Sequence, residues 1–347
     1  MTPNGPANGP FTITIEPSGR SFQSAAADTL LAAAIAQGIN LPYGCKDGAC
    51  GSCKCKKLSG SVVHTLQAKA LSAEDQAAGL VLTCCAQATS DVVLESKQVT
   101  EIGALPIKKL PARVTSLDRL SPDVIRLQLQ LPANDNFAYR PGQYVEIILR
   151  DGSRRSYSMA NASHAGSGLE LHLRHMPGGK FTDHVFGAMQ PKEILRFEGP
   201  YGSFFLREQS DKPIILLASG TGFAPVKALL EQLHALGSQR AITLYWGGRR
   251  PQDLYMQDWV VAQQALLPQL RFVPVVSDAL AEDQWQGRTG LVHRAVLEDI
   301  PDLSAHQVYA CGAPVMVEAA RRDFSAQAGL PAEEFYADAF TSEADKH

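Results

Sequence analysis

Closely spaced cysteines are the first residues that could do chemistry. Cys45, Cys50 and Cys53 follow the pattern Cys-x4-Cys-x2-Cys, and after a long gap a fourth ligand could come from Cys84 or Cys85. Plant-type [2Fe-2S] sites have this spacing, with four thiolates holding two irons. The loop has glycines at positions 44, 48 and 51, which let a backbone wrap closely around a cluster. Zinc sites usually combine two close cysteine pairs, so the pattern predicts an iron–sulfur centre instead.

A second segment, residues 154–161 (RRSYSMAN), has the residue types of a flavin site. An arginine can bind a pyrophosphate through two N–H groups. An aromatic ring two residues later can stack on a flavin, and a neighbouring hydroxyl can reach a ring nitrogen. Residues 176–182 then form a glycine turn before a predicted helix, whose first amides can bind phosphate. RSYS alone is typical of an ordinary strand end, but together with this turn it favours a flavin site.

A third segment, residues 219–225 (SGTGFAP), follows a predicted strand over 214–217 and opens a predicted helix over 225–236. A glycine turn between a strand and a helix is a phosphate-binding context. The turn lacks the third glycine of the dinucleotide fingerprint, where Pro225 stands, and it has no Walker A lysine. Cys311 ends a later predicted strand at the same sheet edge, where α/β ligand sites form. A lone buried cysteine is more often an inert core thiol, so this residue gains meaning only from its position.

Three domains must position these motifs, and the fold class that we predict is multidomain α+β and α/β. Residues 1–10 are rich in Pro, Gly and Asn and are predicted to be disordered. Residues 11–99 form a small α+β domain around the cysteine loop. Residues 106–209 carry alternating strands with Gly/Pro turns, which predict an antiparallel β-barrel. Residues 210–347 alternate short apolar strands with helices, which predicts a parallel sheet with covered faces.

Local signals predict several individual elements. An Ala/Leu-rich helix should run from Asp28 to Gly38, and Ser72 should cap a short helix with Asp75 as its partner. Residues 97–110 are predicted to be a connector, because prolines lie close by at positions 106 and 111. Residues 199–204 are predicted to form a tight turn that closes the barrel.

Composition excludes several classes of function. Lys and Arg number 32 against 35 Asp and Glu, and this net charge of −3 lacks the basic excess of nucleic-acid-binding proteins. No apolar run approaches the ~20 residues of a membrane helix, and the start of the chain lacks the features of a signal peptide. Seven cysteines, an odd number, argue against a disulfide framework. We therefore expect a cytoplasmic protein without nucleic-acid or membrane partners.

The three blocks in this order resemble ferredoxin–NAD(P)H reductases with an N-terminal plant-type ferredoxin domain. This reductase type serves ring-hydroxylating dioxygenases and multicomponent monooxygenases. Five runs are most similar to CDP-6-deoxy-Δ3,4-glucoseen reductases, which pass electrons to a pyridoxamine-dependent sugar dehydrase: RSYSMAN, PGGKFTDHVF, EGPYGSFFL, LASGTGFAPVK and LYWGGRRPQDLY. The resemblance covers residues 11–340. It implies a β-grasp ferredoxin domain, a β-barrel domain for FAD and an α/β domain for NADH, with NADPH as the alternative.

The resemblance also assigns roles to individual residues. For FAD it implies Arg155 at the pyrophosphate, Tyr157 stacked on the ring, Ser158 near N5, and Gly179, Lys180 and Thr182 at the phosphates. For the dinucleotide it implies Gly220, Thr221 and Gly222 at the pyrophosphate, and Cys311 beside the nicotinamide. Tyr157, Ser158 and Cys311 are therefore the expected catalytic residues. Related sequences place an acidic residue seven positions after the last ligand, as Asp91 follows Cys84, and this favours Cys84 as the fourth ligand.

The three expected cofactors form a chemical sequence. A nicotinamide gives two electrons as one hydride, a cluster takes one electron at a time, and a flavin can do both. The predicted path runs from NADH through FAD to the cluster and on to a terminal enzyme, either a dehydrase or an oxygenase component. A non-enzymatic iron–sulfur sensor or carrier is the alternative from another class, and the flavin and nucleotide segments count against it. Arg249 and Arg250 follow a predicted strand where a 2′-phosphate could bind, so the choice between NADH and NADPH stays open.

Overall fold

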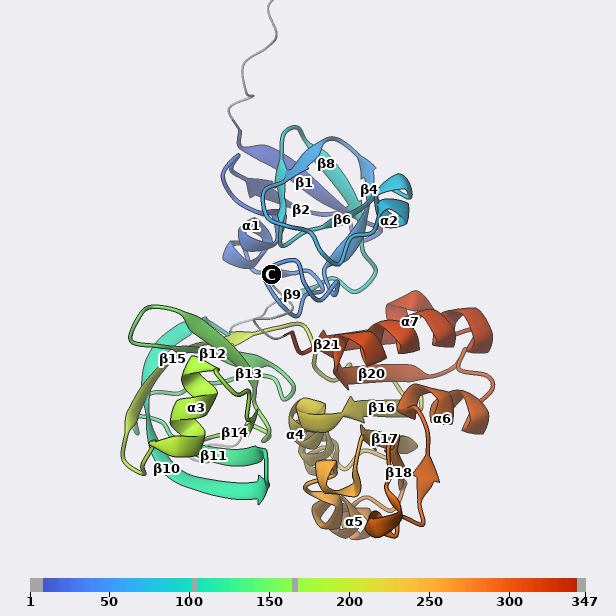
Figure 1. Cartoon of the computed structure of the whole chain (residues 1–347). Coiled ribbons are helices and arrows are strands. Elements are labelled where there is room, and N and C mark those ends of the chain that lie inside the picture. The colour runs from blue at the N-terminus through green and yellow to red at the C-terminus, as the bar shows by residue number, and fades with distance from the viewer. Residues whose placement is uncertain (1–8, 102–104, 164–167, 342–347) are drawn as a thin grey trace, which may run out of the picture. The chain divides into compact units, whose positions relative to one another are not determined.

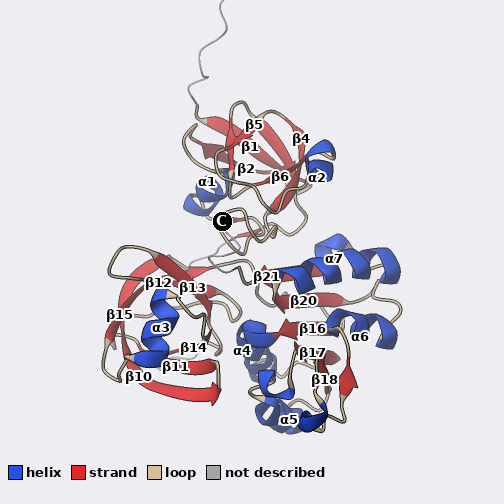
Figure 2. Ribbon diagram, in the orientation of Figure 1, coloured by secondary structure: helices blue, strands red, loops and turns tan. Residues whose placement is uncertain are grey.

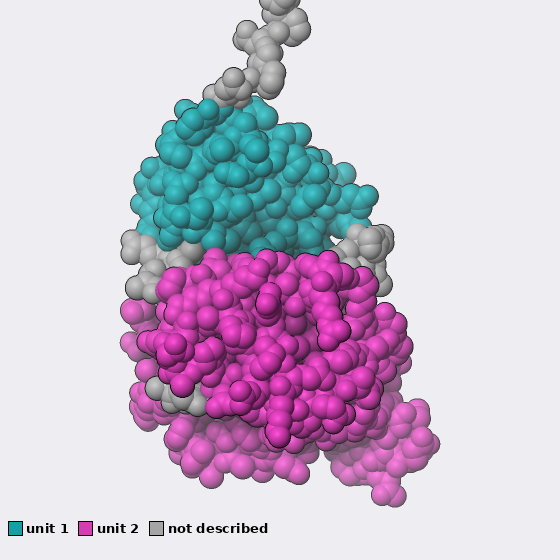
Figure 3. All heavy atoms as spheres, turned by 90° about the vertical axis from the view of Figure 1, so that its left-hand side faces the viewer, with its two compact units in different colours: residues 1–104, 338–347 teal, residues 105–337 magenta. Residues whose placement is uncertain are grey.

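The computed structural model describes residues 9–101, 105–163 and 168–341. The chain divides into two compact units, residues 1–104 with 338–347 and residues 105–337 (Figure 3). Most of the segment that we expected to be disordered, residues 1–8, lies outside the described residues.

The first unit is built on a five-stranded sheet with the order β2-β1-β8-β4-β6 (Figure 1). Its strands are β1 (Phe11–Glu16), β2 (Arg20–Ser24), β4 (Lys54–Ser59), β6 (Leu80–Leu82) and β8 (Val92–Glu95). Two small pairs complete it: β3 (Ile39–Asn40) with β9 (Thr100–Glu101), and β5 (Val62–His64) with β7 (Ala86–Ala88). Helix α1 (Leu30–Ala36) buries Leu30 and Leu31. This sheet and helix confirm the predicted β-grasp class.

Helix ends in this unit follow their capping residues. The Thr29 hydroxyl accepts a hydrogen bond from the Ala32 amide, so α1 begins after Thr29 and not at Asp28. Helix α2 (Ala73–Ala77) has the predicted capping box: Ser72 Oγ accepts from the Asp75 amide, and the Asp75 carboxylate accepts from the Ser72 amide.

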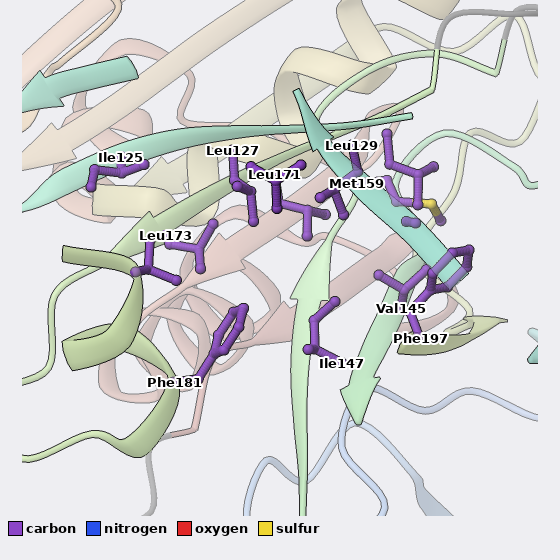
Figure 4. Packing of buried hydrophobic residues seen from close by; sticks show 14 of the residues in the cluster. Ile125, Leu127, Leu129, Val145, Ile147, Met159, Leu171, Leu173, Phe181 and Phe197 are labelled. Carbon is purple, nitrogen blue, oxygen red and sulfur yellow. The ribbon is translucent and has the colours of Figure 1, made fainter. Parts of the chain in front are cut away.

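The second unit begins with a six-stranded antiparallel barrel of order β13-β12-β15-β10-β11-β14. Its strands are β10 (Lys108–Ser121), β11 (Val124–Gln130), β12 (Tyr144–Ile148), β13 (Arg154–Ser158), β14 (Leu169–Arg174) and β15 (Ile194–Tyr201). A bridge between Met159 and Leu171 joins the two end strands. Buried side chains fill the interior, and α3 (Lys180–Gly187) adds Phe181 and Val185 to them (Figure 4). The predicted β-barrel is confirmed.

Two local predictions in the barrel are wrong. Residues 97–110 are not a plain connector, because β9 lies within this range and β10 already begins at Lys108. Pro111 is tolerated there because the register pairs this part of β10 with β15 alone, leaving an unpaired side for a residue without N–H. Residues 199–204 are not all turn, since β15 continues to Tyr201. Pro200 is tolerated within β15 because it lies beside the register shift between β15 and β12, where the ladder does not need its missing donor.

The rest of the second unit is an α/β domain whose sheet has the order β19-β18-β17-β16-β20-β21 (Figure 2). The strands are β16 (Ile214–Ser219), β17 (Ile242–Gly248), β18 (Leu270–Val276), β19 (Arg288–Thr289), β20 (Gln307–Gly312) and β21 (Phe335–Ala339). Its helices are α4 (Phe223–Ala235), α5 (Gln257–Leu266), α6 (Val292–Asp299) and α7 (Pro314–Ala328), and short 3-10 turns lie at Gly220–Gly222, Pro251–Asp253, Ala281–Asp283 and Ala332–Glu334. Neighbouring strands from β19 to β20 are parallel, as predicted.

The strand order reverses between β16 and β20, and such a switch point is where open α/β sheets bind ligands. Helix α4 begins at Phe223, two residues before the predicted start. Within the described ranges, no helix is both long enough and apolar enough to cross a membrane.

Candidate functional site

Two cysteine pairs lie together in the first unit. The Cys45 amide donates to Cys50 Sγ at 3.2 Å, and the Cys50 amide donates to Cys45 Sγ at 3.3 Å. Cys53 Sγ lies 3.2 Å from Cys84 Sγ, and Cys84 also contacts Cys45. The structure therefore brings the four predicted ligands together as Cys45 with Cys50 and Cys53 with Cys84. Two thiolates for each of two irons is the arrangement that a [2Fe-2S] cluster requires.

The loop around these cysteines fits a bound cluster. Gly48 has φ +82°, and a β-carbon on it would lie 2.7 Å from Cys85 Sγ and 2.6 Å from the Gln67 carbonyl oxygen. Only glycine is therefore compatible with this close approach. Ser52 Oγ is buried and finds no hydrogen-bond partner in the part of the chain that the structure describes. A buried hydroxyl beside the ligands could donate to the sulfur of a cluster.

The remaining cysteines of this unit differ from the two pairs. Cys85 Sγ lies 3.5 Å from Cys84 Sγ, but it is Cys84 that contacts Cys53. Cys55 lies on β4 and is 3% exposed, and this burial raises the pKa of its thiol to about 12. Cys55 is thus a protonated core thiol, whereas the geometry favours Cys84 over Cys85 as the fourth ligand.

The predicted flavin residues of the barrel converge on the first turn of α3. Side chains alternate along β13, so Arg155 and Tyr157 share one face, and Ser158 lies buried on the other at the strand end. The Tyr157 ring packs against Phe181 at 5.5 Å between centroids. Lys180 Nζ forms an ion pair with Asp151 in the β12–β13 turn at 2.6 Å. The Tyr157–Phe181 contact places the first turn of α3 beside the face that carries Arg155 and Tyr157, whereas the Lys180–Asp151 pair is largely exposed and adds little.

The start of α3 has the shape of a phosphate cradle. Gly178 has φ +82° with open space around it, and Gly179 is the N-cap without a side-chain hydrogen bond. The Thr182 hydroxyl donates to the Met176 carbonyl at 3.0 Å and accepts from the Met176 amide at 3.2 Å. Thr182 therefore shapes the turn with its hydroxyl, and the uncapped amides are left for an anion.

The predicted dinucleotide turn lies at the switch point of the parallel sheet. Gly220–Gly222 follow β16, and a β-carbon on Gly222 would lie 2.2 Å from the carbonyl oxygen of Cys311 on β20. The Trp246 indole donates to the Gly220 carbonyl at 3.1 Å, and Thr221 lies half-buried between the two glycines. Cys311 is fully buried. The structure therefore brings together all four predicted nucleotide residues at one sheet edge.

An aromatic cluster packs against the start of α4, directly after this turn. Phe223, the first residue of α4, stacks on Trp246 with 3.9 Å between ring centroids. Tyr255 and Trp259 meet Phe223 edge-on at 6.1 and 6.0 Å. Rigid aromatic packing of this kind fixes where the turn and the helix start lie.

Arg174 is a candidate site residue that the sequence analysis missed. A β-carbon on Gly220 would lie 3.1 Å from Arg174 Nη1, so the guanidinium lies over the predicted phosphate turn. Its Nε is 3.1 Å from Asp123 and its Nη2 is 3.6 Å from Asp253. The run LELHLR places Glu170, His172 and Arg174 on one face of β14, but nothing in the run itself indicates that this face meets the nucleotide turn.

Glu170 and His172 form a buried polar pair on that face. His172 Nε2 lies 2.8 Å from Glu170 Oε1, and its Nδ1 lies 2.9 Å from the Tyr255 hydroxyl. Burial lowers the pKa of His172, so the ring is neutral. Burial alone would raise the pKa of Glu170, but the His172 hydrogen bond and the Lys227 charge lower it to about 2. Glu170 is therefore an anion that needs its partners.

Of the two residues that could bind a 2′-phosphate, Arg250 is paired closely with a carboxylate, whereas the Arg249 side chain is 84% exposed. Arg250 makes two 2.7 Å hydrogen bonds to Asp283, and Arg249 Nε lies 3.3 Å from Asp278. An additional phosphate at this place would compete with these ion pairs.

Comparison with known families gives one match for each of the three regions. Residues 13–89 match the family described as a 2Fe-2S iron-sulfur cluster binding domain. Residues 111–206 match the oxidoreductase FAD-binding domain, and residues 216–322 match the oxidoreductase NAD-binding domain.

Full-length relatives have the same three regions. The chain is 41% identical over 333 residues to the CDP-6-deoxy-L-threo-D-glycero-4-hexulose-3-dehydrase reductase of Yersinia pestis, with 95% of this chain and 98% of the relative covered. It is 36% identical to reductase component 2 of the terephthalate 1,2-dioxygenase of a Comamonas species, with 95% and 97% covered. Among solved structures, an Amycolatopsis cytochrome P450 reductase superposes with a TM-score of 0.76 at 32% identity, covering 96% of this chain and 99% of that one.

Proposed function

The chain belongs to the family of iron–sulfur flavoprotein reductases that join a 2Fe-2S domain to FAD- and NAD-binding domains, and from this premise we propose its electron acceptor and its site residues. It is an oxidoreductase of the electron-transfer type. FAD bound in the barrel would supply the conversion between the two-electron chemistry of the nicotinamide and the one-electron chemistry of the [2Fe-2S] cluster. The protein itself has to hold, align and shield these groups.

We propose the cofactor residues that the family resemblance implies, and the geometry of each domain supports them. Cys45, Cys50, Cys53 and Cys84 would hold the cluster, and the first turn of α3, with Gly179 and Lys180, would hold the FAD phosphates together with Arg155. Tyr157 would stack on the flavin, and Thr182 would keep the phosphate turn in shape. Gly220, Thr221 and Gly222 would line the pyrophosphate of the dinucleotide, with Cys311 beside the nicotinamide. The observation that carries this assignment is the convergence of each set within its own domain.

We propose a CDP-6-deoxyhexulose 3-dehydrase as the terminal acceptor and NADH as the donor. The 41% identity to the Yersinia dehydrase reductase supports the acceptor, and the two hydrogen bonds that already pair the Arg250 guanidinium with Asp283 support NADH. The test is to supply NADH to the purified protein together with a purified dehydrase and its sugar nucleotide. Formation of the reduced sugar supports the proposal. Turnover with the oxygenase component of terephthalate dioxygenase but not with the dehydrase would favour the second candidate, an oxygenase reductase, because the Comamonas relative is 36% identical.

Ser158→Ala is expected to slow flavin reduction by NADH while FAD stays bound. Ser158 is buried at the end of β13, where its hydroxyl is the group that we assign to the flavin N5 side. A lost hydrogen bond of this kind costs about 1 kcal/mol, or roughly fivefold in rate, when the bond matters in the transition state. Stopped-flow absorbance at the flavin band measures the rate. Reduction at the wild-type rate would remove Ser158 from the proposed site.

Arg174→Met is expected to weaken NADH binding with little change in the maximal rate. The guanidinium lies over Gly220, where it can pair with a phosphate of the dinucleotide. A hydrogen bond to a charged group contributes about 1.5–3 kcal/mol, so KM for NADH should rise about tenfold to a hundredfold. Arg271→Met, which removes an exposed arginine paired with Asp299, is the matched control and should leave KM unchanged. An unchanged KM in the Arg174 variant would contradict the assignment.

A further inference from the structure

A buried polar network joins the barrel to the nucleotide-binding domain within the second unit. Along β14, apolar and polar side chains alternate, which is the usual pattern of a strand with one solvated face. Glu170 and His172 are nevertheless only 7% and 4% exposed. The nucleotide-binding domain supplies their partners, because Tyr255 contacts His172 and Lys227 of α4 contacts Glu170.

Lys227 lies at the centre of this network and is 4% exposed. Its Nζ is 3.2 Å from Glu170 Oε1, 2.5 Å from Glu231 Oε1 and 3.1 Å from the carbonyl oxygen of Ala160. An ammonium has three N–H donors, and these three oxygens can accept all of them. The centroid of the Trp259 ring lies 5.0 Å from Nζ, so the ring covers the ammonium from a further side.

The neighbouring groups leave little freedom in this arrangement. Burial raises the pKa of Tyr255, so its hydroxyl is protonated and donates to Nδ1 of the neutral His172. His172 must then carry its proton on Nε2 and donate to Glu170, whose other oxygen accepts from Gln128 at 2.8 Å. Glu231 accepts from the Ala162 amide at 2.7 Å. The network therefore has an assigned donor for each of these contacts, and its members hold one another in place.

Lys227 lies close in sequence to the nucleotide turn and contacts a residue close to the proposed flavin serine. Gly222, the last residue of the dinucleotide turn, precedes Lys227 by five residues at the start of α4. Ala160, the acceptor of its hydrogen bond, follows Ser158 by two residues at the end of β13. One side chain thus connects the helix that begins at the nucleotide turn to the segment that carries the proposed flavin serine.

We propose that Lys227 is a positioning residue for hydride transfer. Its side chain sets the distance between the nucleotide turn and the end of β13. The inference rests on the proposed function and adds to it a residue that contacts neither cofactor in our assignment. Removal of the ammonium leaves the buried Glu170 carboxylate and the partly buried Glu231 carboxylate without their shared cation, and they must separate or admit water. The turn at residues 220–222 and the segment at residues 158–162 would then lose their fixed register.

The test compares Lys227→Met with Lys212→Met in the full-length protein reconstituted with FAD and cluster. Lys212 forms an ion pair with Glu334 at 2.6 Å but is half-exposed and precedes β16, at the sheet end opposite the nucleotide turn. In Lys227→Met, flavin reduction at saturating NADH should slow by about a hundredfold, the effect of a small misplacement of reacting groups. The dissociation constant for NAD⁺ and the FAD content should stay within about twofold of wild type, because ground-state binding does not need the alignment. Lys212→Met should match wild type in all three.

Amide hydrogen exchange gives a readout that does not depend on turnover. The peptide covering residues 157–163 contains the Ala162 amide bonded to Glu231, and its deuterium uptake should rise in Lys227→Met but not in Lys212→Met. Glu231→Gln is a second variant in case Lys227→Met does not fold. It keeps the shape but removes one carboxylate, and it should show the same two changes to a smaller extent.

The outcomes separate the inference from the proposed function. If NADH does not reduce the flavin of the wild-type protein, the proposed function is contradicted. The inference itself fails if NADH reduces the flavin of Lys227→Met as fast as that of wild type and amide exchange is unchanged. If Lys227→Met does not fold, the same result in Glu231→Gln would overturn it. A slower rate accompanied by an equal loss of NAD⁺ binding would also overturn the inference, because it would indicate a role in binding.

Discussion

Cys84→Ser is expected to remove the iron–sulfur cluster while leaving NADH able to reduce the flavin. Cys84 Sγ lies 3.2 Å from Cys53 Sγ and is 3% exposed, so a serine there loses a thiolate and leaves the cluster with three of four ligands. Changes in outer-shell partners already cost ~10–100-fold in metal affinity, and loss of a ligand should cost more. The measurement is iron and sulfide content together with EPR of the reduced protein.

The matched variant is Cys85→Ser. Cys85 is fully buried and lies beside Cys84, but in our assignment it is not a ligand. The Cys85→Ser variant should have the iron content and EPR signal of wild type. It should also still reduce a one-electron acceptor that takes electrons from the cluster. Reduction of ferricyanide directly from the flavin should survive in both variants, which shows that the flavin and nucleotide domains are intact. Cluster loss in Cys85→Ser with a normal cluster in Cys84→Ser would reverse the assignment.

Gly222→Ala should abolish NADH-driven flavin reduction without loss of FAD or cluster. A β-carbon at this position would lie 2.2 Å from the Cys311 carbonyl oxygen and 2.7 Å from Gly312 Cα. Both atoms belong to the backbone, so the turn must move away from β20. We expect a decrease of ~1–3 kcal/mol in the free energy of unfolding from overpacking and at least about a hundredfold slower flavin reduction from the displaced nucleotide turn. Thermal unfolding and stopped-flow absorbance measure the two effects.

The control for this variant is Gly187→Ala. Gly187 ends α3, and a β-carbon added to it would meet nothing within 4 Å, so the position has room for a methyl group. The variant should keep both stability and the reduction rate. A Gly222→Ala protein that binds NADH normally and reduces its flavin at the wild-type rate would mean that the nucleotide does not lie over this turn.

Local sequence signals predicted the parts of the structure that depend on neighbouring residues. The cysteine spacing predicted the four sulfurs that lie together in two pairs, and the Ser72–Asp75 capping box formed as the sequence indicated. The strands of the parallel sheet were predicted because their apolar runs are short and lie between helices. In each of these cases a few consecutive residues carry the physical cause.

Long-range partners explain what the sequence did not predict. The run LELHLR has the pattern of a solvated strand face, and only the packing of another domain against β14 makes Glu170 and His172 buried. Lys227 lies in a largely apolar helix, and its role depends on Glu170 and Glu231, which contact it in the folded protein. The helix sequence alone therefore does not predict that role. Pro111 misled the prediction for β10 because a strand with one unpaired side accepts a proline.

An anaerobic titration of the purified protein with NADH, followed by absorbance and then by EPR, tests the electron path most directly. We predict that NADH bleaches both the flavin and the cluster bands and produces a rhombic [2Fe-2S] signal, and that NADPH in a parallel titration is less effective. A colourless protein that contains zinc, or a coloured one that neither nucleotide bleaches, would contradict the assignment of this chain as an NADH-dependent iron–sulfur flavoprotein reductase.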